Sequence, residues 1–204
     1  MDHRDHVALL RPGVAAAPGA TWADLGAGTG AFTLALADLL GPGATIIAVD
    51  RDGAALRSAV DAVARSFPAV TVRPLVADLG RLAEDGGLPA LDGIVAANSL
   101  HFVTRDRQAP VIAGLAAALR PGSPFVVVEY DADRGNRWVP EPFSSRSWPA
   151  LAMAAGLVRP RELARVPSRF LGAIYSAAAE RPSATDATAG TSTSTSRSTS
   201  DGST

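Results

Sequence analysis

The sequence predicts an α/β protein in which helices cover both faces of a mainly parallel sheet. Short apolar segments rich in β-branched residues recur along the chain, and helix-forming segments separate them. A glycine-rich turn also follows the first apolar segment. Alternation of strand and helix makes each connection a crossover, which places successive strands parallel. The expected strands are residues 21–25, 45–49, 70–76, 91–97 and 124–130.

Start and stop signals define the helices between these strands. The expected helices are residues 31–40, 52–67 and 104–120, with a shorter one within 79–88. Asp52 and Thr104 are suitable N-cap residues because their side-chain oxygens accept hydrogen bonds from free backbone N–H groups. Proline or glycine follows each of the three longer segments, and both residues end helices.

The pattern changes after the fifth strand. Residues 144–156 have a helical pattern, with Ser147 as a possible N-cap and Gly156 as the stop. Residues 159–166 and 169–179 then read as two strands joined at Pro167-Ser168, which predicts an antiparallel hairpin at one edge of the sheet. The last segment is also compatible with a helix.

The chain divides into residues 1–180, which form one domain, and a tail of residues 181–204. The tail is rich in Ser and Thr and has almost no apolar side chains to bury. Ordering such a segment costs backbone entropy without a compensating gain, so we expect it to be disordered.

Composition excludes several kinds of chemistry. The 204 residues carry a net charge of −1, so no overall basic field favours nucleic acid. The chain has no cysteine, which excludes a thiolate nucleophile and cysteine-bound metal. It has no lysine, which excludes Schiff-base chemistry and a Lys-containing phosphate loop. No apolar run is long enough to span a membrane, so we expect a soluble cytoplasmic protein.

The turn after the first strand, within TWADLGAGTGAF, is the candidate ligand site. Glycines lack a Cβ and let the backbone approach a ligand, and parallel sheets bind ligands beyond the carboxyl ends of their strands. GAGTGA formally matches a dinucleotide-binding pattern. However, its third glycine comes one residue early, and the carboxylate of Asp24 would repel a pyrophosphate. A ligand that carries an ammonium group fits Asp24 better, and a simple tight turn is the remaining alternative.

The segment ADLGAGTG resembles the first motif of class I S-adenosylmethionine (SAM)-dependent methyltransferases. The resemblance extends over residues 5–179, through the acid that ends IIAVD, the acid of VAD, the polar segment AANSLHF and RPGSPFVVVEYD. It implies a Rossmann-like sheet of seven strands in the order 3-2-1-4-5-7-6, with strand 7 antiparallel. It also implies SAM as the cofactor.

The resemblance assigns the glycine turn to the methionine part of SAM. Asp24, Gly26 and Gly28 match the residues that surround this moiety, and the backbone at Ala27 and Gly28 comes close to the ligand. Gly30 lets the following helix begin tightly against the strand.

The resemblance assigns the next two strand ends to adenosine. Asp50 matches the carboxylate that binds both ribose hydroxyls, and Arg51 follows it in the same cofactor-binding set. Asp78 matches the residue that meets the adenine amine, with the backbone of Leu79 nearby. The spacing of Asp50 from the turn fits SAM and NAD equally. Asp78 alternatively provides ordinary turn chemistry.

Asn98 and His101 are the candidate catalytic residues. Asn98 ends the fourth strand, at the position that faces the methyl group in the resembling family, and also belongs to its cofactor-binding set. The sequence Asn98-Ser99-Leu100-His101 lacks the prolines of enzymes that methylate amines of nucleobases or protein glutamine. His101 is a candidate base or substrate contact, because histidine titrates near neutral pH, or else a neutral residue beside a helix. A metal site on Asp131 and Asp133 is disfavoured because Asn98 replaces the expected first carboxylate.

The acceptor is expected to be a small molecule, because no inserted substrate domain is recognisable. An arginine excess in residues 134–169 favours an anionic substrate or RNA phosphates, although solvated arginines on a helix and an edge strand explain it equally simply. These arginines are Arg134, Arg137, Arg146, Arg159, Arg161, Arg165 and Arg169. An NAD-type oxidoreductase and a SAM-binding module without activity are the alternatives. The sequence does not define the oligomeric state.

Overall fold

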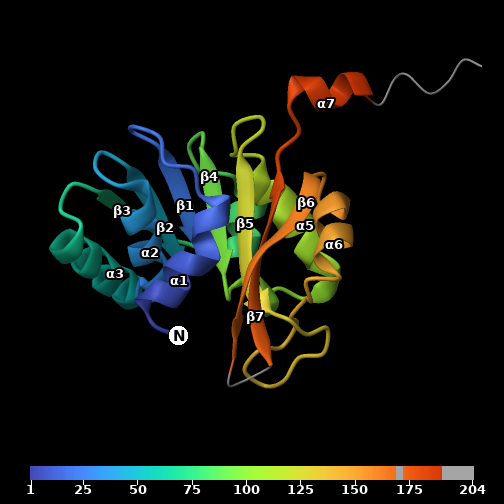
Figure 1. The fold of residues 1–204 in the computed structure, drawn as a ribbon, viewed down its shortest axis with the longest axis horizontal. Helices are drawn as coiled ribbons and strands as arrows, with labels where there is room; N and C mark the ends of the chain where they lie inside the picture. Colours follow the sequence, from blue (N-terminus) through green and yellow to red (C-terminus); the bar gives the residue numbers. More distant parts are fainter. Residues whose placement is uncertain (169–171, 190–204) are drawn as a thin grey trace, which may run out of the picture.

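The computed structural model describes residues 1–168 and 172–189, and its centre is a seven-stranded sheet (Figure 1). The strand order is β3-β2-β1-β4-β5-β7-β6, and β7 runs antiparallel to both of its neighbours, as predicted. The strands are β1 Thr21–Leu25, β2 Thr45–Asp50, β3 Thr71–Val76, β4 Gly93–Ala97, β5 Pro124–Tyr130, β6 Val158–Pro167 and β7 Ala173–Glu180.

The helices between the strands also follow the sequence signals. They are α2 Ala31–Leu40, α3 Gly53–Ser66, α4 Leu79–Asp85, α5 Arg105–Ala116 and α6 Trp148–Ala154. The side chain of Asp52 caps α3 by accepting hydrogen bonds from the N–H groups of Ala54 and Ala55. Thr104 and Ser147 occupy the N-cap positions of α5 and α6, but neither makes a side-chain capping bond there. The expected helix of residues 104–120 ends early, and the chain then makes backbone turns up to the next strand.

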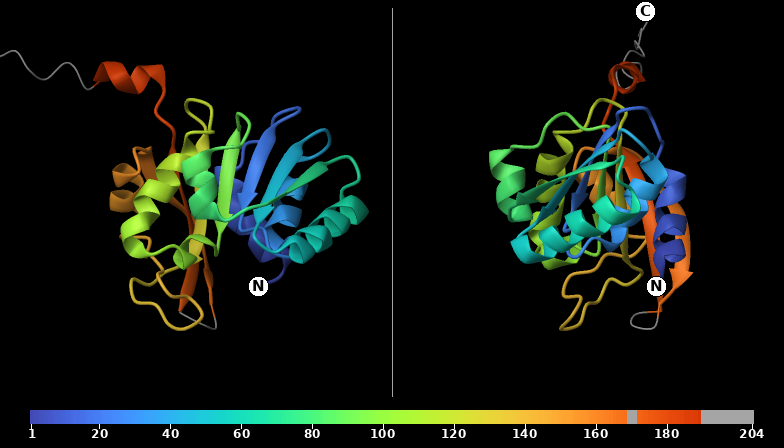
Figure 2. Two further views of the ribbon diagram at one scale, coloured as in Figure 1. Left: turned by 180° about the vertical axis from the view of Figure 1, so that it is seen from behind. Right: turned by 90° about the vertical axis from the view of Figure 1, so that its left-hand side faces the viewer.

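Two hydrophobic cores lie on opposite faces of the sheet. Helices α4, α5 and α6 cover one face, and α2 and α3 cover the other together with the N-terminal helix α1, His3–Leu10 (Figure 2). The sequence did not lead us to expect α1, whose Leu9 and Leu10 are fully buried. An aspartate starts this helix, because Asp2 and Asp5 form a reciprocal capping box.

The expected hairpin at the sheet edge is present. β6 and β7 pair in antiparallel register, for example Val166 with Ile174, and irregularities near Arg161 and Glu162 bend β6. The N–H of Ser168 donates to the carbonyl oxygen of Gly172, which closes the connection between them. Residues 169–171 lie outside the described residues, and the helical alternative for the last segment does not occur in residues 173–179.

The structure describes residues 181–189 of the expected tail, whereas the disorder expected for residues 181–204 stays a prediction. A short helix, α7 Ala184–Ala189, follows β7, and Asp186 forms an ion pair with Arg159 of β6. The backbone of Arg181 also exchanges hydrogen bonds with Gly122 and Ser123. These contacts attach the first part of the expected tail to the domain. Residues 190–204 lie outside the described residues.

The sheet topology defines where a ligand can bind. The strand order reverses between β1 and β4, so their connections leave toward opposite faces and open a crevice at the carboxyl ends. The long loop between β5 and α6 projects from the same end of the sheet, where the parallel strands terminate (Figures 1 and 2). No helix within the described residues has the length and apolar character needed to cross a bilayer.

Candidate functional site: a crevice at the carboxyl ends of β1 to β4

The glycine turn after β1 packs directly against the chain that leaves β4. The N–H groups of Gly26 and Ala27 donate to the carbonyl oxygen of Val49 at 2.8 and 2.9 Å, which folds the turn over the end of β2. Gly26 has a φ of +77°, and a Cβ built there would lie 2.3 Å from the Cβ of Ser99. Only glycine fits this contact. Gly26 therefore sets how closely the turn after β1 approaches the chain after β4.

Gly30 has a different role from the one expected. It is the N-cap of α2, and a Cβ there would lie 2.7 Å from the Cβ of Ala59 in α3. The close approach is thus between two helices, α2 and α3, rather than between a helix and the strand. Apart from the chain neighbours of Gly28, no atom of the described residues lies within 4 Å of a Cβ built there, so the turn faces open space at that position.

Asp24 is buried beneath the glycine turn. Its neighbours in register are Ala48 of β2 and Val95 of β4, and its exposed fraction is 1%. The hydroxyl of Thr33 in α2 donates to its Oδ2 at 2.6 Å, whereas Oδ1 has no hydrogen-bond partner among the described residues. Burial raises the pKa of the Asp24 carboxyl to about 6, and the charge of Asp50 adds to this effect, while the bond from Thr33 opposes it. A buried carboxylate with a free oxygen favours a cationic ligand above it.

Asp50 ends β2, and backbone groups fix both of its oxygens. The N–H of Gly28 donates to Oδ2 at 2.8 Å, and the N–H of Asp52 donates to Oδ1 at 2.9 Å. Each carboxylate oxygen keeps further acceptor capacity, because a carboxylate has about four lone-pair sites. The side chain lines the crevice at the carboxyl end of β2.

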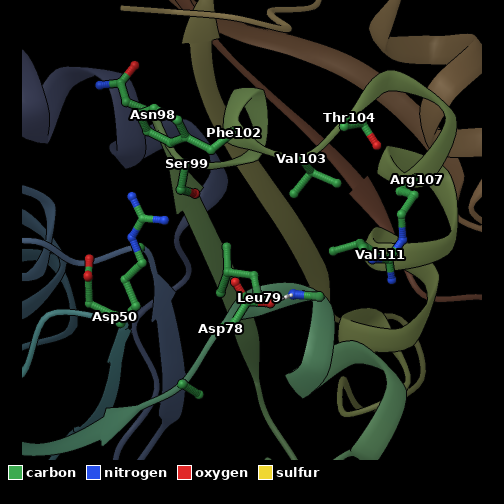
Figure 3. A pocket seen from close by; sticks show the side chains of 14 residues that line it. Asp50, Asp78, Leu79, Asn98, Ser99, Phe102, Val103, Thr104, Arg107 and Val111 are labelled. Atoms are coloured by element: carbon green, nitrogen blue, oxygen red, sulfur yellow. Dashed lines mark hydrogen bonds between the residues drawn. The ribbon is translucent and has the colours of Figure 1, made fainter.

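Asp78 also acts as a helix cap. Its Oδ1 accepts from the N–H of Gly80 at 2.9 Å and from that of Arg81 at 3.2 Å, so it starts α4. Asp78 and Leu79 both line the crevice, where Figure 3 shows them between Asp50 and the start of α5. The cap explains why an aspartate follows β3. Its other oxygen remains available to a ligand.

Two buried polar atoms next to the turn have no hydrogen-bond partner in the part of the chain that the structure describes. They are Oδ1 of Asn98 and Oγ of Ser99, both in residues that line the crevice. Asn98 also has a φ of +51°, a left-handed conformation that asparagine adopts more readily than other residues with a Cβ. Unpaired buried oxygens are typical of functional positions.

His101 lies behind the wall of the crevice. It belongs to the short 3-10 helix η2, Leu100–Phe102, and its exposed fraction is 3%. Its Nδ1 lies 2.9 and 3.0 Å from the two carboxylate oxygens of Glu129 in β5, which is also buried. Glu129 accepts a further bond from the N–H of Tyr130 at 2.7 Å. The pair fastens η2 to β5 and so holds the neighbouring Phe102, which does line the crevice.

The crevice has a volume of about 400 Å³, within the range of small-molecule sites. It is lined by six of the residues that the sequence singled out, namely Gly26, Asp50, Arg51, Asp78, Leu79 and Asn98. Asp24, Ala27, Gly28 and Gly30 form the turn and its support, and His101 lies behind the wall. The predicted residues therefore gather at one end of the sheet.

Sequence reasoning missed the far wall of the crevice. Phe102, Val103, Thr104, Arg107 and Val111 come from η2 and α5 and face Asp50 and Asp78 across the opening (Figure 3). Their position after the fourth strand was the available signal, since every loop at this edge can contribute to the site. Glu129 within VVVEY was also missed, although a charged residue inside an apolar strand indicates a buried partner.

Residues 23–122 match the family model described as a methyltransferase domain. This range includes the glycine turn, Asp50 and Asp78. A search of curated proteins found no match.

Several solved structures share the fold. An arsenic(III) S-adenosylmethionine methyltransferase from Chlamydomonas reinhardtii is 19% identical with a TM-score of 0.66, over 84% of this chain and 66% of that one. The 1,6-didemethyltoxoflavin-N1-methyltransferase of Burkholderia thailandensis is 21% identical with a TM-score of 0.67, over 89% and 78%. The N-methyltransferase NodS of Bradyrhizobium japonicum WM9 is 18% identical with a TM-score of 0.66, over 88% and 87%. The chain thus spans just under two thirds of the length of the algal enzyme.

The strand order, the crevice and the matched model define a methyltransferase domain with a Rossmann-like fold. The matched model supports the resemblance of the first motif to the class I SAM-dependent methyltransferase family. The cofactor of this family is S-adenosylmethionine.

Proposed function

We propose that this protein is a SAM-dependent methyltransferase that acts on a small-molecule acceptor. The observation that carries the proposal is the buried carboxyl of Asp24 under the glycine turn. Its pKa is raised, and its Oδ1 has no hydrogen-bond partner among the described residues. A pyrophosphate at this turn would meet a negative charge, whereas the ammonium group of SAM would be attracted to it. When bound, SAM supplies an electrophilic methyl group.

The residues of the crevice fit the parts of this cofactor. Asp50, with both oxygens fixed by backbone N–H groups, would accept bonds from the ribose hydroxyls, and Arg51 would flank them. Asp78 and the backbone of Leu79 would contact the adenine. The open space at Gly28 leaves room for the methionine part, beside the backbone of Ala27.

Asn98 and His101 would have different roles near the acceptor. The unpaired Oδ1 of Asn98 would accept a hydrogen bond from an N–H or O–H group brought into the crevice. The expected role of His101 as a base stays a prediction, and its pairing with Glu129 behind the wall favours a positioning role. The enzyme would then accelerate transfer chiefly by alignment and by exclusion of water.

Two features favour a small-molecule acceptor. Two of the similar structures carry names with small-molecule ligands or substrates, 1,6-didemethyltoxoflavin and apigenin. The sequence after Asn98 has no prolines of the amine-methylating type, and the absence of cysteine excludes thiolate-based arsenite methylation despite the fold shared with the algal enzyme.

The test compares two substitutions that differ only in position. Asp50→Asn should weaken binding of S-adenosylhomocysteine at least about tenfold, because charge-assisted hydrogen bonds contribute roughly 1.5–3 kcal/mol each. Asp52→Asn makes the same change two residues away, in a helix cap that asparagine also serves, and should leave the affinity unchanged. Equal affinity of a folded Asp50→Asn variant and the wild type, measured by calorimetry, would contradict the assignment. Binding of NAD instead would favour an oxidoreductase, and normal cofactor binding without turnover on any acceptor would favour an inactive module.

A further inference from the structure

The loop between β5 and α6, residues 131–147, is fixed against the wall of the crevice. The N–H of Glu141 donates to the carbonyl oxygen of His101 at 3.0 Å, and the side-chain amide of Gln108 donates to the carbonyl oxygen of Glu141 at 2.7 Å. Arg105 of α5 donates to the carbonyl oxygen of Pro142 at 2.8 Å. These bonds join the loop to η2 and α5. Both of these elements line the crevice.

Two large aromatic side chains are exposed, one in η2 and one in the loop that is bonded to it. Phe102, next to His101, lines the crevice and has an exposed fraction of 61%, and Trp138 in the loop has one of 75%. Trp138 is only three residues from Glu141, so its Cα lies within about 11 Å of the bonded residue. The side chain of Asn136 fixes the backbone on either side of Trp138, because its Oδ1 accepts hydrogen bonds from the N–H groups of Trp138 and Val139. An exposed tryptophan on a fixed backbone is available to stack on a ligand.

The loop also carries positive charge that the protein does not neutralise. The acidic residues of the loop already have other partners. Asp131 forms an ion pair with Arg165, Glu141 forms one with Arg105, and Asp133 accepts hydrogen bonds from serine hydroxyls. Within the part of the chain that the structure describes, no carboxylate pairs with the exposed arginines of the loop. These arginines are Arg134, Arg137 and Arg146.

Arg169 lies outside the described residues, and the other arginines of the excess separate into two groups. In β6, Arg159, Arg161 and Arg165 form ion pairs with neighbouring carboxylates. Arg137 instead stacks over Trp138, with its guanidinium carbon 5.3 Å from the ring centroid. A guanidinium next to an exposed aromatic face fits a ligand that is both planar and anionic.

We propose that Phe102, Trp138 and Arg137 form the acceptor-binding rim of the site, and that the acceptor is a planar aromatic molecule bearing a carboxylate or a similar anion. This inference rests on the proposed function. Trp138 and Phe102 contact the aromatic face, and Arg137 with Arg134 attracts the anionic group at the mouth of the crevice.

Calorimetry of the full chain saturated with S-adenosylhomocysteine tests this rim. The probes are 1-hydroxy-2-naphthoate, its neutral amide 1-hydroxy-2-naphthamide, and non-aromatic cyclohexanecarboxylate. We expect the naphthoate to bind at least about tenfold more tightly than either other probe. Arg137→Gln should weaken naphthoate binding several-fold and leave the amide unchanged, whereas Trp138→Leu should weaken both aromatic probes. The matched controls are Arg65→Gln on α3 and Met153→Ala on α6, both exposed and outside the loop, which should change nothing.

Each other outcome overturns the proposal. Naphthoate binding weaker than about 1 mM, or equal binding of the three probes, would remove the aromatic anion as the acceptor class. If Arg137→Gln and Trp138→Leu both bound the naphthoate as tightly as the wild type does, the acceptor would have to bind elsewhere. A change in oligomeric state caused by Trp138→Leu alone, seen by sedimentation, would assign Trp138 to an interface. Because S-adenosylhomocysteine binding is measured first, its failure would refute the proposed function, and its success without naphthoate binding would refute only this inference.

Discussion

Replacing Asp24 with asparagine should stabilise the fold and weaken cofactor binding at neutral pH. Burial raises the pKa of Asp24 from 3.8 to about 6, so the folded protein holds this proton more tightly than the unfolded chain does. Stability linked to Asp24 is therefore complete below about pH 4 and is lost as the pH rises through the folded pKa. The ionised carboxylate destabilises the fold at neutral pH.

The magnitude follows from the size of the shift. A difference of about two pKa units corresponds to roughly 3 kcal/mol of unfolding free energy at pH 8. The asparagine side chain of the variant keeps an acceptor for the hydroxyl of Thr33 but cannot ionise. Asp24→Asn should thus match the wild type near pH 4 and exceed its stability by up to about 3 kcal/mol at pH 8. Loss of the charge should at the same time weaken S-adenosylhomocysteine binding by about tenfold.

The assay is urea unfolding of both proteins from pH 4 to pH 8, together with calorimetry at pH 8. Asp61→Asn on the exposed side of α3 is the matched control and should show no pH-dependent difference from the wild type. A stability difference between Asp24→Asn and the wild type that stays constant across this range would refute the reasoning. So would a variant that binds S-adenosylhomocysteine as tightly as the wild type.

Three further predictions follow from the packing. Gly26→Ala should cost about 1–3 kcal/mol more unfolding free energy than Gly86→Ala, because both sites have a positive φ but only the first meets Ser99; equal costs in denaturant unfolding would contradict the contact. A double-mutant cycle of His101→Ala and Glu129→Ala should show coupling of at least about 1 kcal/mol, and additive effects would mean that the buried bond does not hold η2. Deleting residues 190–204 should leave the melting temperature unchanged, since the segment has almost no apolar side chains; a clear decrease would contradict the predicted disorder.

The fold was predictable because its signals are local. Apolar runs, helix stops and the Asp52 cap identified the parallel strands and the helices between them, and the resemblance supplied the strand order. Helix α1 was missed because a helix of eight residues is marginal on its own, despite the capping box of Asp2 and Asp5. Burial of Leu9 and Leu10 against distant elements adds to its stability. Helix α7 was missed because composition alone suggested no partner, whereas Asp186 meets Arg159 across the hairpin.

The predictable part of the crevice lining lies at the strand ends. Asp50, Asp78 and Asn98 each lie at or just after the end of a strand, and the parallel sheet brings such positions together. The other wall was not predictable, because Phe102 and Arg107 enter the crevice only through the path of the chain after β4. The exposure of Trp138 likewise depends on long-range bonds that fasten its loop.

Calorimetric titration of the wild-type chain with SAM, S-adenosylhomocysteine and NAD in parallel tests the central claim most directly. The account predicts micromolar binding of both sulfur ligands and no binding of NAD. Binding of NAD without either sulfur ligand would contradict it, because the buried carboxylate of Asp24 would then lie under a pyrophosphate.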